Sequence, residues 1–525
     1  MWKIQEKFFL LIKKYSEIND KSYWLIFFFI LILLAGLPIF SVNFLPMTDL
    51  PQHLAQVHLF YKNLYQPSSE YEINLFMPNL LVYWLMILLW KIVNPIMTGQ
   101  IIAFIIATLW IMAIFLLGYN TNRSLPLVII SSTLVFNTSF YWGFINFLIG
   151  FFFFVLLLIL LEKKKEVNWF LVAKIFTLGL LLFFSHVLWF LAGMIYTILS
   201  SSFSKNSFKE SLAKIAGLVP ISIISFSWFV YFNKALGAAG FVLSPLWIVS
   251  PISRLSPGWI LENTYGGIKS PITAFLLLII ILWIVVTILF NIKTSKRKIN
   301  LNLFRISVLL FLVVLFAPQL VENTILFGSR WFAPAILLLL FSLPKPKINE
   351  SILSVIFTAI FFVFIIETKS KWKDFESIEL SGLTDSINKI EKNSKIIGLA
   401  YFQSSNFIYG KPFMQIFAYA QILKNCELNF TFALHQNGIV TTKNFEKYKQ
   451  WTPGLEWIPE YVRYEDLSKF DFALIGTTDE IHNYFSEDEI FQPITKTGNW
   501  RLYKCNKNLN KKGFLFLLQI IDEKK

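Results

Sequence analysis

The stretch WLIFFFILILLAGLPIF, residues 24–40, decides the fold class of this chain. It carries no charge over most of the ~20 residues that a helix needs to cross the hydrocarbon core of a bilayer. FLLLIIILWIVVTILF at residues 275–290 has the same character. Of the 525 residues, 56% are hydrophobic, only 15% are charged and 56 are phenylalanine. This composition excludes a soluble globular protein and predicts an integral membrane protein.

Hydropathy predicts about eleven membrane spans. No small-residue cleavage site follows the first apolar run, so residues 23–42 are predicted to be a retained span rather than a removed signal peptide. The predicted fold class is a polytopic α-helical membrane protein. The predicted spans begin near Tyr23, Gln100, Leu125, Ile145, Asn168, Leu188, Leu212, Pro271, Leu301, Trp331 and Ser351.

One segment, residues 73–99, is apolar but interrupted by prolines, asparagines and a lysine. If it does not cross the bilayer, 18 basic residues fall on the side of the N-terminus and 6 on the other side. Cytoplasmic loops carry the excess of basic residues, so we favour a cytoplasmic N-terminus and a long first outer loop at residues 43–99. The same rule accounts for the net charge of +15 without a nucleic-acid partner.

The composition changes after residue 366, where charges become frequent and long apolar runs stop. We predict a membrane domain at residues 1–366 and a small outer α/β domain at residues 367–525. KIIGLAYF and FDFALIGTT are predicted strands, FMQIFAYAQILKN a helix, and GNWRLYKC a turn into a final strand. The basic and apolar tail NKNLNKKGFLFLLQIIDEKK is typical of a segment that touches a membrane surface.

The two cysteines, Cys426 and Cys505, both lie in this outer domain. Their even number is compatible with a disulfide on the oxidising side, and their positions are equally compatible with two unpaired residues. The sequence has no CxxC or clustered Cys/His spacing typical of zinc, and no Walker or Rossmann glycine motif. No cofactor and no metal ligand are assigned, and a role for a divalent cation is left open.

The segment TDLPQHLAQ, residues 48–56, directly follows the first span. Asp49, followed by Pro51 and Gln52, is typical of a helix start in which the aspartate is the N-cap and the glutamine closes a capping box. His53 lies near the same face of the first turn as Asp49, whereas His58 is displaced around the helix. Polar loop residues often carry function. Asp49 and His53 are therefore candidate catalytic residues, and His58 is a weaker candidate.

Other polar residues lie on the predicted outer side. His186 ends an apolar span, where an ionisable residue commonly faces a site, although an interfacial histidine held by a carbonyl is an alternative. Arg330 begins a span, and its guanidinium fits a phosphate; the alternative is an anchor at the lipid headgroups. The remaining candidates for substrate binding, each of which also fits an ordinary loop or interfacial position, are Tyr141, Asn146, Glu262 and Glu322, with Asn137 and Trp142 beside them.

In its organisation, the chain resembles the GT-C superfamily of membrane glycosyltransferases, particularly the family 39-like bacterial proteins related to protein mannosyltransferases and lipid A aminoarabinose transferases. PMTDLPQHLAQ is similar to the DxPxHL motif of that family and lies in a long outer loop after the first span. Three further features complete the resemblance: the segment at 73–99, the short spans separated by EKKKE and NTNRS with FINFLIG leading into the fourth, and an outer domain that closes with NWRLY. It covers the whole chain in topology, but its motifs are short.

The resemblance implies that Asp49 is the catalytic base and that a polyprenyl-phosphate sugar is the donor. The family often has a second acid in the next outer loop, but NTSFYWGFIN has none, which leaves that role to His53, Glu262 or Glu322, or vacant. A carboxylate can accept the proton of an acceptor hydroxyl, and a cation such as Arg330 can offset the charge of the leaving phosphate. With a single base and no covalent nucleophile, inversion at the anomeric carbon is expected.

The expected protein is thus an inverting glycosyltransferase of the cytoplasmic (inner) membrane. Its expected partners are the lipid-linked donor, a lipid, glycan or protein acceptor of the cell envelope, and membrane lipids. A transporter or flippase of lipid-linked sugars is an alternative, although the predicted spans are mostly uninterrupted and no repeated halves are visible. The other alternative is a non-catalytic envelope assembly protein on the same scaffold, because the second acid that the family often has is missing.

Overall fold

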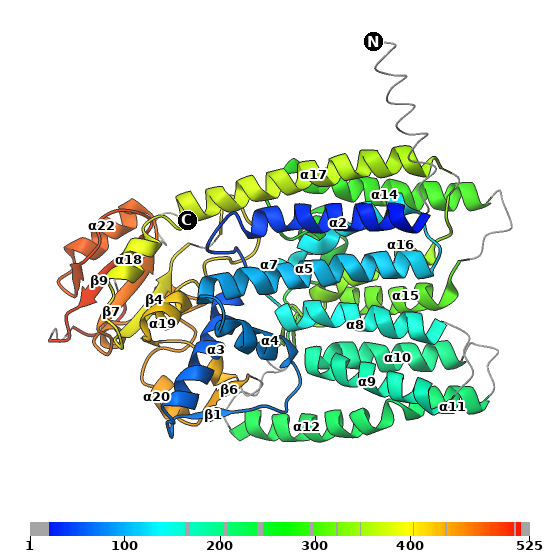
Figure 1. The fold of residues 1–525 in the computed structure, drawn as a ribbon. Helices are drawn as coiled ribbons and strands as arrows, with labels where there is room; N and C mark the ends of the chain where they lie inside the picture. The colour runs from blue at the N-terminus through cyan, green and yellow to red at the C-terminus, as the bar shows by residue number, and fades with distance from the viewer. Residues whose placement is uncertain are drawn as a thin grey trace, which may run out of the picture.

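The chain forms a bundle of long helices with a smaller α/β domain at one end (Figure 1). The computed structural model describes residues 20–162, 168–202, 208–238, 245–292, 299–321, 324–346, 348–402, 404–435, 438–508 and 511–515. The bundle helices are α2 (Asp20–Ile39), α5 (Pro95–Asn120), α6 (Leu125–Ser131), α8 (Ile145–Glu162), α9 (Trp169–Ser185), α10 (Val187–Ser202), α11 (Phe208–Ala216), α12 (Val219–Ala238), α14 (Pro271–Ile292), α15 (Leu301–Phe316), α16 (Phe332–Ser342) and α17 (Glu350–Asp374).

Five of the described helices are long and apolar enough to cross a membrane, and six if α11 and α12, which meet at a 42° bend, form one span. The five are α2, α5, α8, α14, and α17 together with the π-helix Phe375–Glu379. The prediction of about eleven spans is therefore wrong by helix length, because the other predicted spans are apolar helices of 10–17 residues. What the fold shows is a mostly helical protein with the long apolar helices of a membrane-embedded chain.

Polar residues explain why several predicted spans are short. The span predicted from Leu125 is divided by the 3₁₀ turn Ser132–Phe136, after which the Asn137 side chain accepts a hydrogen bond from the Ser139 N–H and starts α7 (Thr138–Tyr141). His186 has an extended backbone and separates α9 from α10. Side chains that satisfy the first free N–H groups of a helix end one segment and start the next.

Residues 43–99, named the first outer loop after their predicted side of the membrane, lie at the same end of the bundle as the α/β domain (Figure 1). The loop contains α3 (Leu50–Tyr65), β1 (Tyr71–Ile73) and α4 (Leu81–Trp90). At ~1.5 Å of rise per residue, the ten residues of α4 cover about 15 Å, which is half the thickness of a bilayer core. This length supports the arrangement in which residues 73–99 do not cross.

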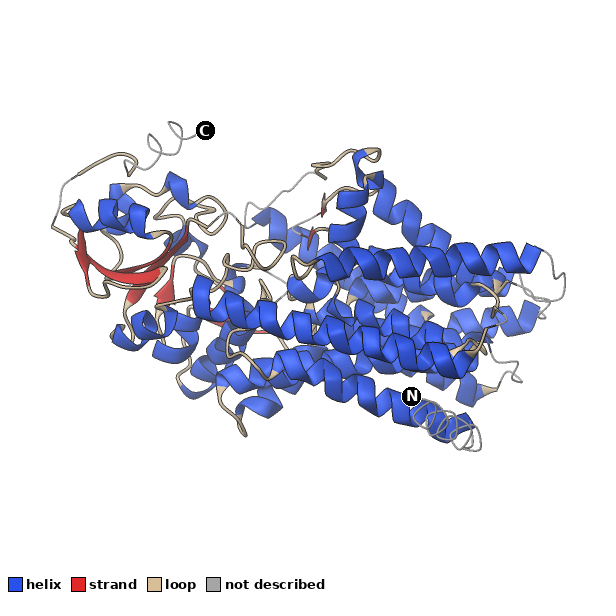
Figure 2. Cartoon of the chain, turned by 90° about the horizontal axis from the view of Figure 1, so that it is seen from above, coloured by secondary structure: helices blue, strands red, loops and turns tan. Residues whose placement is uncertain are grey.

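The predicted change at residue 367 does not interrupt the backbone. Helix α17 continues to Asp374, so the sheet-bearing part of the chain begins only at α18 (Leu383–Lys389). Figure 2 shows the largest group of strands at one end of a mostly helical molecule. The remaining elements of this end are β4 (Lys395–Ala400), α19 (Ala418–Lys424), β5 (Glu427–Leu428), β6 (Val440–Thr442), α20 (Phe445–Tyr448), α21 (Tyr464–Leu467), β7 (Phe472–Gly476), α22 (Asp479–Glu487), β8 (Phe491–Pro493) and β9 (Trp500–Cys505).

A five-stranded sheet in the order β5-β4-β7-β9-β8 forms the centre of the α/β domain. Its first three strands are parallel, and β9 and β8 are antiparallel to their neighbours. The predicted strands KIIGLAYF, FDFALIGTT and GNWRLYKC are confirmed as β4, β7 and β9, and FMQIFAYAQILKN contains α19. Of the predicted tail, residues 509–510 and 516–525 lie outside the described residues.

The sheet order also decides between the two alternatives for the cysteines. Cys426 directly precedes β5, whereas Cys505 ends β9, three strand positions away. Neighbouring strands are ~4.8 Å apart, so this separation is about 14 Å, well beyond the reach of a disulfide. Both residues are buried free cysteines.

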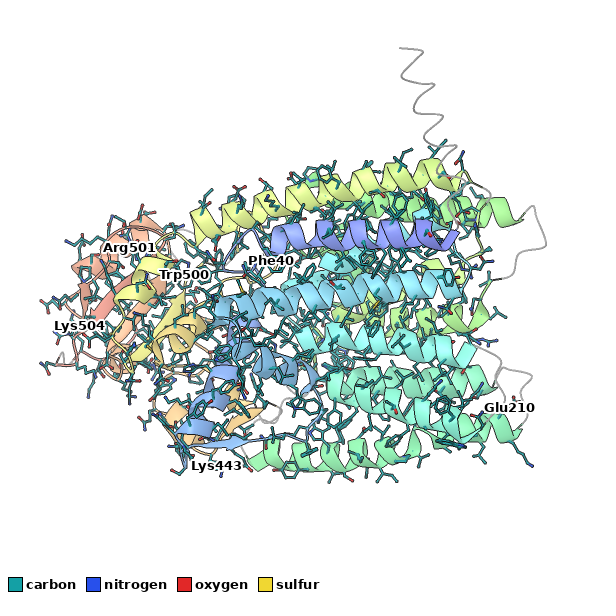
Figure 3. The ribbon with its side chains drawn as sticks, in the orientation of Figure 1. Phe40, Glu210, Lys443, Trp500, Arg501 and Lys504 are labelled. Carbon is teal, nitrogen blue, oxygen red and sulfur yellow. The ribbon has the colours of Figure 1, made fainter. Side chains whose placement is uncertain are left out.

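The α/β domain and the first outer loop are joined directly. Strand β1 pairs with β6 in antiparallel register, with Tyr71 opposite Thr442. The Lys447 ammonium binds Glu70 of the loop at 2.7 Å and Glu427 of the domain at 2.9 Å. In Figure 3, Lys443, Trp500 and Lys504 lie at this end, whereas Glu210 lies at the opposite end of the bundle.

Candidate functional site

Asp49 lies at the start of α3, where a loop from the bundle holds it. The backbone N–H groups of Thr48 and Asp49 donate to the carbonyls of Tyr141 and Trp142, at 2.9 and 3.0 Å. Gly143 follows with φ +75°, and a Cβ placed there would lie 2.9 Å from the Asp49 nitrogen. The YWG segment therefore fixes the backbone on which Asp49 stands.

The predicted capping box at this helix start is wrong. The Asp49 side chain makes no capping hydrogen bond. The Gln52 amide instead donates to the Gln415 side chain at 2.9 Å, and its oxygen accepts from the Phe432 N–H at 3.1 Å. The Gln52 side chain thus binds residues of the α/β domain instead of the backbone at the start of α3. The Asp49 carboxyl group itself accepts no hydrogen bond from the described residues.

Asp49 is nevertheless buried, with 8% of its surface exposed. Burial raises the pKa of its carboxyl group from 3.8 to about 7, against the charge of Arg330, which lowers it. A carboxyl group with a pKa near neutrality is suited to proton transfer, because it can both gain and lose a proton at the working pH.

Arg330 provides the opposite charge. It lies in the 3₁₀ turn Ser329–Trp331 at the start of α16 and is 6% exposed. Its guanidinium donates one hydrogen bond to the Ile325 carbonyl and lies 4.0 Å from the centre of the Phe144 ring, while its Nε has no hydrogen-bond partner. Among the described residues no carboxylate closes an ion pair with it within 4.0 Å.

Asp49 and Arg330 therefore influence each other electrostatically without forming a contact ion pair. Burying two charges without such a contact is costly, because neither charge recovers its lost hydration. Buried charges of this kind are commonly kept for a ligand or a reaction. The arrangement leaves both the carboxylate and the Nε of the guanidinium available to a third group.

His53 has a different environment. Its Nδ1 lies 2.6 Å from the Tyr83 hydroxyl, and its ring packs edge-on against Phe432 at 5.4 Å. Burial lowers its pKa to about 3. Through Tyr83 the neutral ring ties α3 to α4, so its geometry is that of a positioning residue.

Tyr83 is a residue of this site that the sequence did not single out. It is buried on α4, within the ambiguous segment 73–99. A tyrosine in an apolar helix next to membrane spans gives no signal beyond that of an interfacial aromatic residue. Only the packing of α4 against α3 reveals its hydroxyl as the partner of His53.

His186 is connected to Arg330 through the ring of Phe147. Its ring contacts the ring of Phe147 edge-on at 5.5 Å, and Phe147 also lies 5.6 Å from the Arg330 guanidinium. The Nδ1 of His186 accepts the Leu188 N–H at 3.3 Å, and Asn79 accepts the Val187 N–H at 3.3 Å. The first outer loop therefore reaches the start of α10 beside the arginine.

The other predicted residues are dispersed. The Tyr141 hydroxyl accepts a hydrogen bond from the Trp372 indole at 3.2 Å, which assigns it to packing against α17. Asn146 is buried in the first turn of α8, and its Oδ1 has no hydrogen-bond partner. Glu262 is exposed on α13 (Pro257–Thr264), and Glu322 lies outside the described residues. His58 binds Asn425 of the α/β domain at 3.0 Å.

Within the described residues no group of three or more His, Cys, Asp or Glu side chains could hold a metal ion. No protein-family model matches the sequence, and no curated protein matches it significantly. The geometry of Asp49 and Arg330 therefore carries the functional argument.

The pKa of Asp49 predicts how stability depends on pH. The folded chain holds the proton of Asp49 up to about pH 7 and the unfolded chain only to about pH 4, so ionisation costs folding free energy as the pH rises between these values. At ~1.4 kcal/mol per pKa unit the effect is about 4 kcal/mol. The melting temperature of Asp49→Asn is expected to rise relative to wild type from pH 4.5 to 7.5. A constant difference would contradict this pKa.

Gly143→Ala is expected to destabilise the protein, by steric contact with α3 as well as by backbone strain. Gly454 is a matched control, because its φ of +78° is similar but a Cβ there would meet nothing within 4 Å. Gly454→Ala should cost only the ~1 kcal/mol typical of a non-glycine residue at positive φ. Thermal unfolding should show a clearly larger loss for Gly143→Ala, and equal losses would show that the contact with Asp49 is unimportant.

Proposed function

We propose that this protein is an inverting glycosyltransferase with a GT-C-like fold. It would move a sugar from a polyprenyl-phosphate donor to a cell-envelope acceptor at the outer face of the cytoplasmic membrane. The observation that carries the proposal is the pair Asp49 and Arg330, a buried acid and a buried guanidinium that influence each other electrostatically without closing an ion pair.

The roles follow from the charges. Asp49 accepts the proton of the acceptor hydroxyl as this oxygen attacks the anomeric carbon, and the bond from that carbon to the phosphate oxygen breaks. The electron pair of the broken bond leaves with the polyprenyl phosphate, whose growing negative charge Arg330 stabilises. The free Nε of Arg330 supports this role, since a phosphate oxygen would supply its missing acceptor. Attack opposite the leaving group gives inversion.

The position of the pair supports a lipid-linked donor. Asp49 follows α2, and Arg330 precedes α16, so both lie at the end of the bundle where the α/β domain sits. A donor whose chain lies in the bilayer presents its phosphate and sugar at such a surface. We place this end outside the cytoplasm, on the basis of the basic residues in the opposite loops.

The α/β domain covers the site. The Thr48 hydroxyl, next to Asp49, donates to the Lys411 carbonyl of the domain at 3.2 Å, and Gln52 is buried in the domain through Gln415. Closing a site against water strengthens the electrostatic interactions inside it. The domain is thus part of the catalytic enclosure in this proposal.

The test is transfer of radiolabelled sugar from polyprenyl-phosphate donors, using the full chain purified into liposomes. Transfer that depends on Asp49 and Arg330 supports the proposal. Movement of intact labelled lipid between leaflets without any transfer would favour the flippase alternative. If neither transfer nor movement occurs in a correctly folded protein with a range of donors, the non-catalytic alternative gains support.

A further inference from the structure

The loop PLWIVSPISRLS, residues 245–256, exposes an unusual amount of apolar surface. Five large side chains are between 49% and 82% exposed: Leu246, Trp247, Ile248, Ile252 and Leu255. The only charged residue of the loop, Arg254, is 2% exposed. The loop therefore presents an apolar and aromatic surface with no charge on it.

This shape is built by specific contacts. The Arg254 guanidinium donates to the carbonyls of Val314 and Ala317 at 2.7 and 2.6 Å, and to that of Val249 at 3.2 Å. The Gln319 side-chain oxygen accepts the Ile248 N–H at 2.9 Å, and the Trp247 indole donates to the Phe316 carbonyl at 3.0 Å. These hydrogen bonds hold the backbone and Arg254 inward, so that the large apolar side chains lie outward together with the uncharged Ser250, Ser253 and Ser256.

The loop lies at the end of the bundle that carries the α/β domain. It falls between α12 and α14, and Ile268, just before α14, forms a β-bridge with Ile408 of that domain. Leu246 bridges to Leu320, in the hairpin of β2 (Leu320–Val321) and β3 (Thr324–Ile325). The Ile325 carbonyl of this hairpin accepts the hydrogen bond from Arg330.

We propose that residues 246–255 insert into the bilayer leaflet at this end of the bundle. The loop is followed by α13 and then by α14, a candidate span whose Phe275 and Leu278 side chains are 48% and 51% exposed. Tryptophan with large aliphatic residues and no exposed charge is the composition of a segment at the headgroup and acyl boundary. A lipid surface is therefore the partner that fits the loop.

Insertion would place Arg330 close to the level of the lipid headgroups, because the loop and the arginine are attached to the same hairpin. The importance of this position rests on the proposed function, in which Arg330 binds the phosphate of a lipid in the membrane. The insertion itself does not require that function, and the test below does not measure transfer.

The test uses a spin label at Ile252→Cys in the full chain reconstituted in phosphatidylcholine and phosphatidylglycerol vesicles. Cys426 and Cys505 are 2% and 6% exposed, and unsubstituted protein measures their background labelling. Tyr461→Cys is the control, because Tyr461 is 47% exposed on the α/β domain. We expect oxygen to relax the label at 252 more strongly than a water-soluble nickel complex, and the reverse at 461. If the nickel complex relaxes the label more strongly than oxygen at both 252 and 461, the proposal is wrong.

A second measurement does not depend on labelling. In vesicles of brominated lipid, wild-type tryptophan fluorescence should be quenched more than that of Trp247→Phe, since the substitution removes a lipid-contacting indole. If the wild type and the variant are quenched equally, Trp247 does not contact lipid. A loop buried against another protein chain would protect both the spin label and Trp247 from oxygen, nickel and bromine, which would also contradict insertion.

Discussion

Sugar transfer by the Asp49→Asn variant is expected to fall by about 10²–10⁴-fold, the range typical of losing a general base. Asparagine has nearly the same shape as aspartate, and the carboxyl group makes no hydrogen bond with the described residues, so the fold should be retained. The measurement is the initial rate of transfer from a radiolabelled donor. Asp385→Asn, which changes an exposed carboxylate on α18, is the matched control and should change the rate less than twofold.

The pH profile gives this prediction a second signature. A base with a pKa of about 7 must lose its proton before it can act, so the wild-type rate should rise through neutral pH and level off above it. The residual rate of Asp49→Asn should lack this step. Undiminished transfer by a folded Asp49→Asn variant would remove Asp49 as the base, whatever the pH.

Replacing Arg330 by glutamine is expected to lower transfer by about 10²–10³-fold, comparable to the loss of one preorganised donor in an anion-stabilising site. Arg330→Lys should recover only part of this loss, because an ammonium is a point charge and cannot reproduce the planar, bidentate fit of a guanidinium stacked on Phe144. Steady-state rates as a function of donor concentration will show whether the loss lies in kcat or in the donor KM.

Arg123 is the control for this substitution. Its guanidinium is partly buried and donates to the carbonyls of Phe341 and Ser342 at the C-terminal end of α16, whereas Arg330 precedes that helix. Arg123→Gln should lower the melting temperature and leave kcat of the folded protein unchanged. In Arg330→Gln, the acidic limb of the pH profile should also move to higher pH, since the charge that lowers the pKa of Asp49 is gone. An unmoved limb would mean that the two groups are not coupled.

Local sequence patterns predicted the elements whose structure is set by their own residues. The β-branched and aromatic runs of β4 and β7 are confirmed, because a buried parallel strand needs such a run and little else. The choice of Asp49 rested on its place after a span, and the structure finds it buried near a positive charge, as an active carboxylate requires. Its role in catalysis stays a prediction.

The structural features that the sequence did not predict depend on contacts between residues that are far apart in the chain. The capping box was a reasonable local reading of Asp49 and Gln52, yet the glutamine binds partners in the α/β domain that no local pattern identifies. The pairing of β1 with β6 was missed for the same reason. The number of spans was overestimated because hydropathy counts an apolar run without fixing the length of the helix that it forms, and α9 and α10 end after 17 and 16 residues.

The union of α3 with the α/β domain also sets an order of events during synthesis. Gln52 and Gln56 bind residues that follow them by 363 and 384 positions. At about 5–20 residues per second, the ribosome delivers those partners roughly 20–80 s later. Until then the helix that carries Asp49 has no partner for its buried amides. The surroundings of Asp49 are therefore completed only after Gln415 and Val440 have been synthesised, and a chain that ends before them lacks these contacts.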